Sequence, residues 1–273
     1  LAEWMVDPKN PLLSRVFVNR VWQYHFGAGI VTTPNDFGFN GDRPSHPKLL
    51  DWLAVDFMQH SWSMKQLHRR IVLSAVYRQG SQYNSKAAAR DGANRLLWRV
   101  TPRRLEAETI RDTILQVSGQ LDVALGGPSF RLFRYIDGNV PEYVLLQDPG
   151  RETWRRAVYM YNIHTFGSPL MRAFDCADAM LQVPRRVHSV TALQALSLMN
   201  NRFVFEQAGL FARRVVVAAG NRPEEQAVEA YRIALLRKPT VTERQAASEF
   251  VREHGLLSLC RVLLNTNEFL YVF

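Results

Sequence analysis

Residues 10–51, NPLLSRVFVNRVWQYHFGAGIVTTPNDFGFNGDRPSHPKLLD, join a clear helix pattern to a polar, glycine-rich loop. Asn10 can cap a helix, and Pro11 suits its first position because an N–H there would have no helical partner. Gly27 is the predicted end of this helix. Apolar residues recur between these signals at helical spacing: Leu13, Val16, Phe17, Val21 and Tyr24. We interpret the rest of the chain as helices built around this stretch.

The polar loop at residues 32–47 follows the helix. It carries carboxylate, amide and imidazole side chains close to the predicted start of the next helix, where backbone N–H groups and the helix dipole favour an anion. The alternative is structural, since Asp and Asn side chains also satisfy turns and Phe37 and Phe39 can fill a core. The predicted ligand or partner site consists of Asp36, Asn40, His46, Arg20 and Arg78.

Helical patterns cover most of the remaining chain. Residues 45–60 and 63–75 predict two helices that pack as a hairpin, and capping boxes are expected at Thr191 and Thr240. Between residues 126 and 164 the helical period fails, and glycine and proline turns separate short aromatic and β-branched runs. The sequence therefore predicts a mainly α, multi-helix bundle-like fold with a small β or extended insertion around residues 128–165.

The sequence indicates the fold class more clearly than it indicates the number of domains. A chain of 273 residues can bury a sizeable core, so we expect a single domain over residues 1–273. Residues 80–94 are polar and break the helical pattern. Two lobes with a seam near residues 80–100 are the alternative.

A charged face accompanies the predicted helix that starts near residue 102. Arg104, Glu108 and Asp112 follow one another at intervals of four, and Arg111 lies three residues beyond Glu108. Charges of both signs at this spacing can pair along a helix. We interpret the four residues as a structural ion-pair ladder. The alternative is a pair of carboxylates that act as acid and base, which the basic neighbours disfavour by holding both carboxylates ionised.

The composition narrows the possible functions. The formal net charge is +9, and the basic residues are mostly arginine without a long basic run. Arginine favours fixed pairing with carboxylates inside a fold, so we expect no specific nucleic-acid binding, with an acidic partner surface as the alternative. No apolar run approaches the roughly 20 residues of a membrane span. The chain begins in mid-pattern, as expected for a piece of a longer protein.

Cofactor and catalytic motifs are missing from the sequence. Cys176 and Cys260 are too few for a disulfide framework, and without C-x-x-C-H no covalent haem is expected in this part of the protein. The two thiols are interpreted as buried, although an exported protein could pair them. The histidines form neither H-E-x-x-H nor zinc-ligand spacing, and G-x-S-x-G is absent, so we predict no metal, no cofactor and no identifiable catalytic residue.

Several short motifs, spread in order along the whole chain, resemble one known family. They are NRVW (19–22), DFGFNG (36–41), PSHP (44–47), LDWLA (50–54), YRQ (77–79), RRLEAE (103–108), RD (111–112), QALSLMN (194–200) and NEFLYV (267–272). This set is similar to the planctomycete PSD domain, a family of unknown function.

The resemblance implies a cellular context and no catalytic residues. Such domains sit at the C-terminal end of larger exported proteins, after a c-type cytochrome module and a second uncharacterised domain. The expected location is therefore the periplasm or cell surface, and the expected partners are neighbouring domains of the same protein. Two functions follow: a non-catalytic docking module, or an enzyme that acts on a polysaccharide or other extracytoplasmic substrate. The enzyme would use the loop at residues 32–47 with Arg20, Arg78 or the face at residues 104–112.

Overall fold

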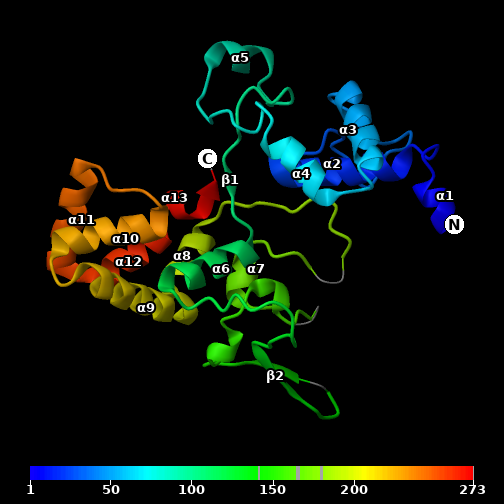
Figure 1. Cartoon of the computed structure of the whole chain (residues 1–273). Coiled ribbons are helices and arrows are strands. Elements are labelled where there is room, and N and C mark those ends of the chain that lie inside the picture. Colours follow the sequence, from blue (N-terminus) through cyan, green and yellow to red (C-terminus); the bar gives the residue numbers. More distant parts are fainter. Residues whose placement is uncertain (141, 164–166, 179–180, 273) are drawn as a thin grey trace. The chain divides into compact units, whose positions relative to one another are not determined.

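A computed structural model of the chain shows a mainly helical protein (Figure 1). It describes residues 1–140, 142–163, 167–178 and 181–272. These residues contain thirteen α-helices, two 3-10 helices and two small two-stranded sheets. The predicted fold class, mainly α with a small β insertion, is confirmed.

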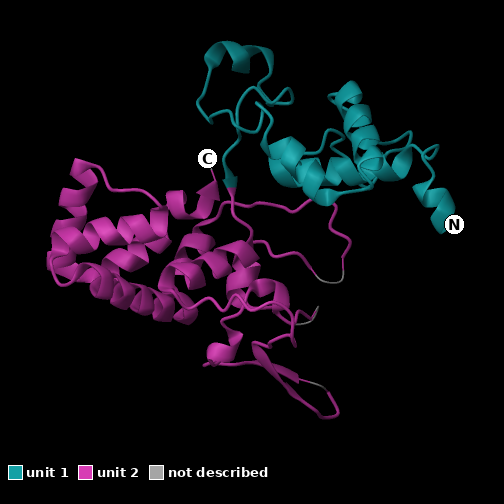
Figure 2. Cartoon of the chain, in the orientation of Figure 1, with its two compact units in different colours: residues 1–103, 273 teal, residues 104–272 magenta. Residues whose placement is uncertain are grey.

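The chain divides into two compact units, which Figure 2 distinguishes by colour. Unit 1 is Leu1–Arg103 and unit 2 is Arg104–Val272. The boundary follows Arg103, just beyond the seam that the sequence placed near residues 80–100. The interpretation of residues 1–273 as a single domain stays a prediction.

Unit 1 is built on α2, which begins at Leu12, so Pro11 precedes the helix and does not take its first position, whereas the predicted end at Gly27 forms. The Asn10 side chain accepts a hydrogen bond from the first helical N–H at 3.1 Å, and Gly27 ends the helix with a φ of 82°. The buried face differs from the predicted one, because Tyr24 is 68% exposed while Val18 and Trp22 are buried. The helices of this unit are α1 (Ala2–Val6), α2 (Leu12–Phe26), α3 (Pro47–Gln59), α4 (Met64–Val72) and α5 (Ser85–Arg90).

The core of unit 1 lies among α2, α3 and α4. The Phe17 and Phe57 rings stack with their centroids 4.9 Å apart, and Leu53 and Ile71 are buried beside them. Aromatic stacking adds to the free energy gained by burying the apolar surface. Apolar burial therefore fixes these three helices together and positions the loop that joins α2 to α3.

Unit 2 has a larger core, formed mainly by α6 and α9–α12. Ile110 and Ile114 of α6 and Phe211 of α9 are fully buried there. With Ala107 and Val117, the two isoleucines form an apolar stripe along one face of α6. The elements of this unit, with the strand that begins at its boundary, are β1 (Arg103–Arg104), α6 (Ala107–Ser118), η1 (Arg151–Thr153), η2 (Ala157–Tyr159), α7 (Pro169–Ala173), α8 (Ala192–Asn200), α9 (Arg202–Ala219), α10 (Pro223–Leu235), α11 (Val241–His254), α12 (Leu256–Leu264), α13 (Asn267–Leu270) and β4 (Tyr271–Val272).

The β insertion of unit 2 is a hairpin of β2 (Phe133–Ile136) and β3 (Glu142–Leu145), which pair antiparallel. In Figure 1 it projects from the helices of its unit. The insertion continues to η2 at Ala157–Tyr159, and Met160 beyond it forms an isolated β-bridge with Phe130. β3 is the nearer partner for β2, and closing the short turn after Asp137 costs less entropy than closing a longer loop.

Candidate functional site

The loop at residues 32–47 is anchored in unit 1 by a buried amide. Asn19 of α2 donates to the Val31 carbonyl at 3.0 Å and accepts the Val31 N–H at 2.8 Å. Gly29 lies against this amide, and a Cβ there would come within 2.7 Å of the Asn19 nitrogen. Only glycine allows such a close approach. The asparagine of the NRVW motif thus holds the chain that leads into the loop.

Polar side chains inside the loop bind its own backbone. Asp36 Oδ1 accepts the Gly38 N–H at 2.8 Å, a turn that Asp commonly makes. The Thr33 hydroxyl donates to the Asp36 carbonyl at 2.8 Å and accepts the Asp42 N–H at 2.9 Å. The Asp42 carboxylate accepts a hydrogen bond from Thr32. These contacts brace the turn internally.

His46 lies at the junction of the loop with α3. It is the residue before the helix, and its φ of −134° and ψ of 75° are not helical, as expected before Pro47. Its Nδ1 lies 3.0 Å from the Ser45 hydroxyl. The Ser45 hydroxyl and N–H both donate to the Ile30 carbonyl, so Ser45 does not cap α3. Phe39, which the structural alternative would place in a core, is fully exposed.

The other predicted site residues lie in the same unit. Arg20 reaches the loop, where its Nη2 donates to Asn35 Oδ1 at 2.5 Å. Asn40 and Arg78 are exposed. Among the described residues, no hydrogen bond or ion pair joins the members of the predicted site to one another. A ligand-binding role stays a prediction for Asp36, Asn40, His46, Arg20 and Arg78.

The charged face of α6 pairs mostly with other parts of unit 2, which corrects the predicted ladder. Arg104, just before the helix, pairs with Asp175 at 2.7 Å. Glu108 accepts two hydrogen bonds from Arg186, at 2.7 and 2.9 Å. Two parallel hydrogen bonds from one arginine bind a carboxylate more strongly than a single ion pair with a residue one turn away on the same helix. Within the part of the chain that is described, these residues connect α6 to the segment at 175–186.

The protonation of Glu108 fits a structural role. Burial is the largest influence and acts to raise the pKa of Glu108, but the hydrogen bonds and charge of Arg186, a backbone hydrogen bond and the Cys176 contact together lower it. Cys176 Sγ lies 3.5 Å from the same carboxylate, and burial raises the pKa of this thiol to about 11. A general acid needs a pKa near the working pH, so an ionised Glu108 beside a protonated thiol does not suit acid catalysis.

One contact of the predicted ladder does form. Arg111 Nη1 lies 3.6 Å from Asp112 Oδ1. The same oxygen accepts the Ala157 N–H at 2.7 Å. Burial raises the pKa of Asp112, although the Ala157 hydrogen bond and Arg111 act against this shift. Asp112 therefore anchors η2 to α6 and compensates the charge of Arg111 only in part.

Arg111 is a buried cation. Its side chain is 4% exposed and lies between the Phe130 and Phe203 rings, with its guanidinium carbon 5.0 and 5.4 Å from their centroids. It donates to the Arg155 carbonyl at 2.8 Å and to the Thr153 carbonyl. Burial lowers the pKa of Arg111 to about 10, so the group stays charged at neutral pH.

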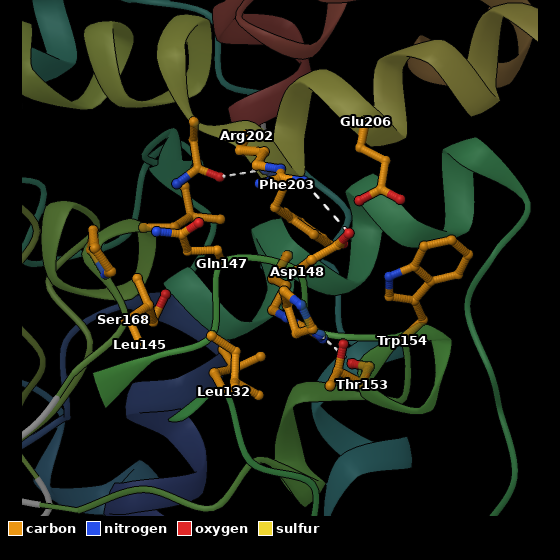
Figure 3. Close-up of a pocket in the computed structure, with 16 residues that line it drawn as sticks. Leu132, Leu145, Gln147, Asp148, Thr153, Trp154, Ser168, Arg202, Phe203 and Glu206 are labelled. Carbon is orange, nitrogen blue, oxygen red and sulfur yellow. Dashed lines mark hydrogen bonds and ion pairs between the residues drawn. The ribbon is translucent and has the colours of Figure 1, made fainter. Parts of the chain in front are cut away.

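Arg111 also lines a cavity of about 390 Å³ in unit 2. The wall is shared by α6, the hairpin ends, the segment around η1 and the first turns of α7 and α9. Figure 3 shows Asp148 near the middle of the view, with Trp154 to one side and Leu145 and Ser168 to the other. Much of the wall is apolar: Leu132, Leu145, Leu146, Trp154, Leu170 and Phe203.

A second cavity of about 250 Å³ shares Asp148, Trp154 and Glu206 with the first. It adds Arg151 and Arg213 to the lining. We call the two cavities together the unit-2 groove. Its charged lining is four arginines and two carboxylates, an excess of two positive charges: Arg111, Arg151, Arg202, Arg213, Asp148 and Glu206.

Only part of this charge is paired within the groove. Arg202 Nη2 lies 3.5 Å from Asp148 Oδ2, and both side chains are largely exposed. Exposed ion pairs contribute little because water screens them. Arg111, in contrast, is shielded from water, so its charge acts more strongly on whatever enters the cavity.

The PSD1 family model, described as a protein of unknown function (DUF1553), matches residues 1–251. The chain belongs to this family. No curated protein and no solved structure matches the chain. The resemblance found in the short motifs is confirmed, and PSD1 membership by itself assigns no reaction.

No cluster of three or more His, Cys, Asp and Glu side chains could hold a metal among the described residues, and His164 lies outside them. No described helix is both long and apolar enough to cross a membrane. Cys176 and Cys260 are free thiols, and Cys260 is buried.

Sequence reasoning missed the unit-2 groove, although one signal pointed to it. Arg111 lies four residues after Ala107 and three before Ile114, on the same face as the apolar stripe of α6. A charged residue at such a position is rarely buried without a partner. The ladder interpretation instead placed Arg111 among charged neighbours. The remaining wall comes from segments far apart in the chain, which periodicity cannot bring together.

Proposed function

We propose that this chain is a non-catalytic docking module of a larger exported planctomycete protein, and that the unit-2 groove receives an acidic segment of a neighbouring domain. The observation that carries the proposal is the cavity of about 390 Å³, whose wall is apolar and whose lining holds the buried cation Arg111. The volume falls within the range of roughly 300–1,000 Å³ that is usual for binding sites.

Charge supports an acidic partner. The unit-2 groove has two more positive than negative side chains, and the whole chain has a formal net charge of +9. Complementary potentials favour association and suppress wrong partners. In the extracytoplasmic context that the family resemblance implies, the nearest candidates are the other domains of the same protein, including a c-type cytochrome module.

Docking accounts for the groove better than catalysis does. Arg111, with its pKa lowered by burial to about 10, keeps its proton at neutral pH and supplies charge, not proton transfer. The alternative enzyme, with its site at residues 32–47, stays a prediction of the sequence. Asp36 and Asp42 of that loop are engaged in hydrogen bonds within it. The absence of a cofactor from this part of the protein also stays a prediction.

Association between separately produced parts of the full-length protein tests the proposal. The rest of the protein is titrated with this chain in a calorimeter, with wild type compared with Leu146→Asp. Leu146 lines the cavity, so an aspartate there removes apolar contact and repels an acidic segment. We expect affinity to fall at least about tenfold, or about 1.4 kcal/mol.

A matched control uses the same substitution elsewhere on unit 2. Val217 of α9 is 88% exposed and does not line the groove, so Val217→Asp should bind as wild type does. Equal loss of affinity in both variants, or no association of the wild type with any other part of the protein, would refute the docking proposal.

A further inference from the structure

The buried charge of Arg111 is incompletely compensated. A guanidinium has five N–H donors, and the hydrogen bonds described for Arg111 go to two main-chain carbonyls, Arg155 O and Thr153 O. Carbonyl oxygens carry partial charge only. The Phe130 and Phe203 rings attract the cation through their faces, but they bring no negative charge.

The carboxylate next to Arg111 is shared. Asp112 Oδ1 is 3.6 Å away and accepts the Ala157 N–H at the shorter distance of 2.7 Å. Asp112 therefore neutralises the guanidinium less than a bidentate carboxylate would. A buried cation without a close counter-ion is costly, and a ligand that brings a carboxylate relieves that cost.

Arg111 faces a space that a ligand can enter. Both it and Thr153, whose carbonyl it binds, line the larger cavity. Leu132, Leu146 and Phe203 line the same space and exclude water from the charge. This combination suits a carboxylate on a short side chain, flanked by apolar groups that contact the walls.

We infer that the unit-2 groove recognises a single Asp or Glu side chain flanked by apolar residues, with the carboxylate directed to Arg111. The inference rests on the proposed docking function and names what is recognised. Asp148 and Glu206, which border both cavities, carry negative charge at the exposed edge. The apolar side chains that line the cavity beside Arg111 suit uncharged flanking residues, so an isolated acid is preferred over an acidic run.

Two capped tripeptides test this preference with a change of charge alone. The probes are acetyl-Leu-Glu-Leu-amide and acetyl-Leu-Gln-Leu-amide, titrated into the whole chain and followed by NMR at the Trp154 indole and the Arg111 side chain. We expect the glutamate peptide to bind at least about tenfold more tightly at low salt, with the preference falling as salt screens the charge. Equal binding, or tighter binding of the glutamine peptide, would overturn the inference.

A substitution at the edge of the groove gives a test that does not disturb the buried charge. Glu206→Gln removes an exposed repelling carboxylate and should tighten the glutamate peptide by about two- to fivefold, while the glutamine peptide is unaffected. Glu249→Gln is the matched control, because Glu249 is an exposed residue of α11 outside the groove. The affinity of an acetyl-Glu-Glu-Glu-amide probe should rise more on Glu206→Gln substitution than the affinity of the peptide with a single acid.

Arg111→Met removes the cation and keeps an apolar side chain. It should abolish the preference for glutamate while both peptides still bind through their leucines. If this variant does not fold, the effect of Glu206→Gln on glutamate-peptide binding still tests the inference. Loss of affinity for the partner in Leu146→Asp, without any glutamate preference, would leave docking standing and refute the acid inference. A glutamate preference without any association of the other domains would refute docking alone.

Discussion

At the scale of single residues, α6 carries two carboxylates with opposite pKa shifts. At Glu108 burial acts to raise the pKa, but Arg186, a backbone hydrogen bond and Cys176 together lower it, whereas burial dominates at Asp112 and raises its pKa. A carboxyl group with a lowered folded pKa stabilises the fold when ionised, and one with a raised pKa opposes folding when ionised. Acid should therefore affect the two residues in opposite directions.

Glu108→Gln should lower the free energy of unfolding at neutral pH. The Glu108 side chain is 28% exposed and bound by two Arg186 donors, so the expected loss is about 1–3 kcal/mol, nearer the lower value because water partly screens the pair. The contribution of the ionised group is present above the unfolded pKa of about 4.3 and is lost as pH falls through the lowered folded value. Urea unfolding at several pH values would measure this, and the difference between variant and wild type should shrink below about pH 4.3.

Asp112→Asn is the contrasting variant on the same helix. The penalty from the ionised carboxylate is present above the raised folded pKa and disappears as pH falls towards the unfolded value of about 3.9. The wild type should therefore gain stability relative to Asp112→Asn as pH falls towards about 3.9, whereas it loses stability relative to Glu108→Gln as pH falls below about 4.3. The same pH trend in both variants would contradict the two pKa directions.

The two thiols give a further prediction at this scale. Burial raises the pKa of both cysteines, to about 11 for Cys176. The thiolate is the reactive form, so little of it is present at pH 8. A colorimetric disulfide reagent should react slowly with the folded chain and release two equivalents quickly once urea is added. Rapid reaction of one equivalent in the native state would show that Cys176 is accessible and activated.

At the scale of elements, signals within one turn were predicted best. The capping boxes at Thr191 and Thr240 form, and Gly119 ends α6 in the left-handed region, because these features depend on residues a few positions apart. Which face is buried was harder to predict. Leu193 and Leu196 lie in the apolar run of α8 but are 63% and 56% exposed, which is not unusual because apolar residues are common on protein surfaces.

The groove lay beyond sequence reasoning for a different reason. Arg111, Leu146, Ser168 and Phe203 meet around one cavity although they come from α6, the segment after β3, and the first turns of α7 and α9. Periodicity describes each helix separately and says nothing about which helices meet. The loop at residues 32–47 attracted attention because its unusual residues are consecutive. Asp36 makes the turn contact that the sequence analysis gave as the alternative, by accepting the Gly38 N–H.

Helix α9 offers a test of packing, because it carries two phenylalanines in different environments. Phe211 is fully buried in unit 2, and Phe205 is about half exposed. Phe211→Ala removes a buried ring and should cost about 3–5 kcal/mol, whereas Phe205→Ala should cost about 1 kcal/mol or less. Chemical denaturation monitored by circular dichroism measures both. Similar losses would mean that α9 does not bury the face described here.

At the scale of the whole molecule, two separate groups of buried residues are present among the described residues. One lies in unit 1, with Leu53, Phe57 and Ile71, and the other in unit 2, with Ile114 and Phe211. The PSD1 match over residues 1–251 extends across both units. A family match that spans two cores does not decide whether they unfold together, because cooperativity depends on the free energy that couples them.

Calorimetry with one core variant in each unit distinguishes the two arrangements. Leu53→Ala and Phe211→Ala each remove a buried side chain and should cost about 2–5 kcal/mol in their own unit. Since each residue belongs to a different core, we expect two thermal transitions, with each variant lowering one midpoint and leaving the other unchanged. A single transition that both variants lower would establish residues 1–273 as one cooperative domain. In that case the unit-2 groove would unfold together with unit 1, and Leu53→Ala should weaken binding of the glutamate peptide on approach to the shared transition.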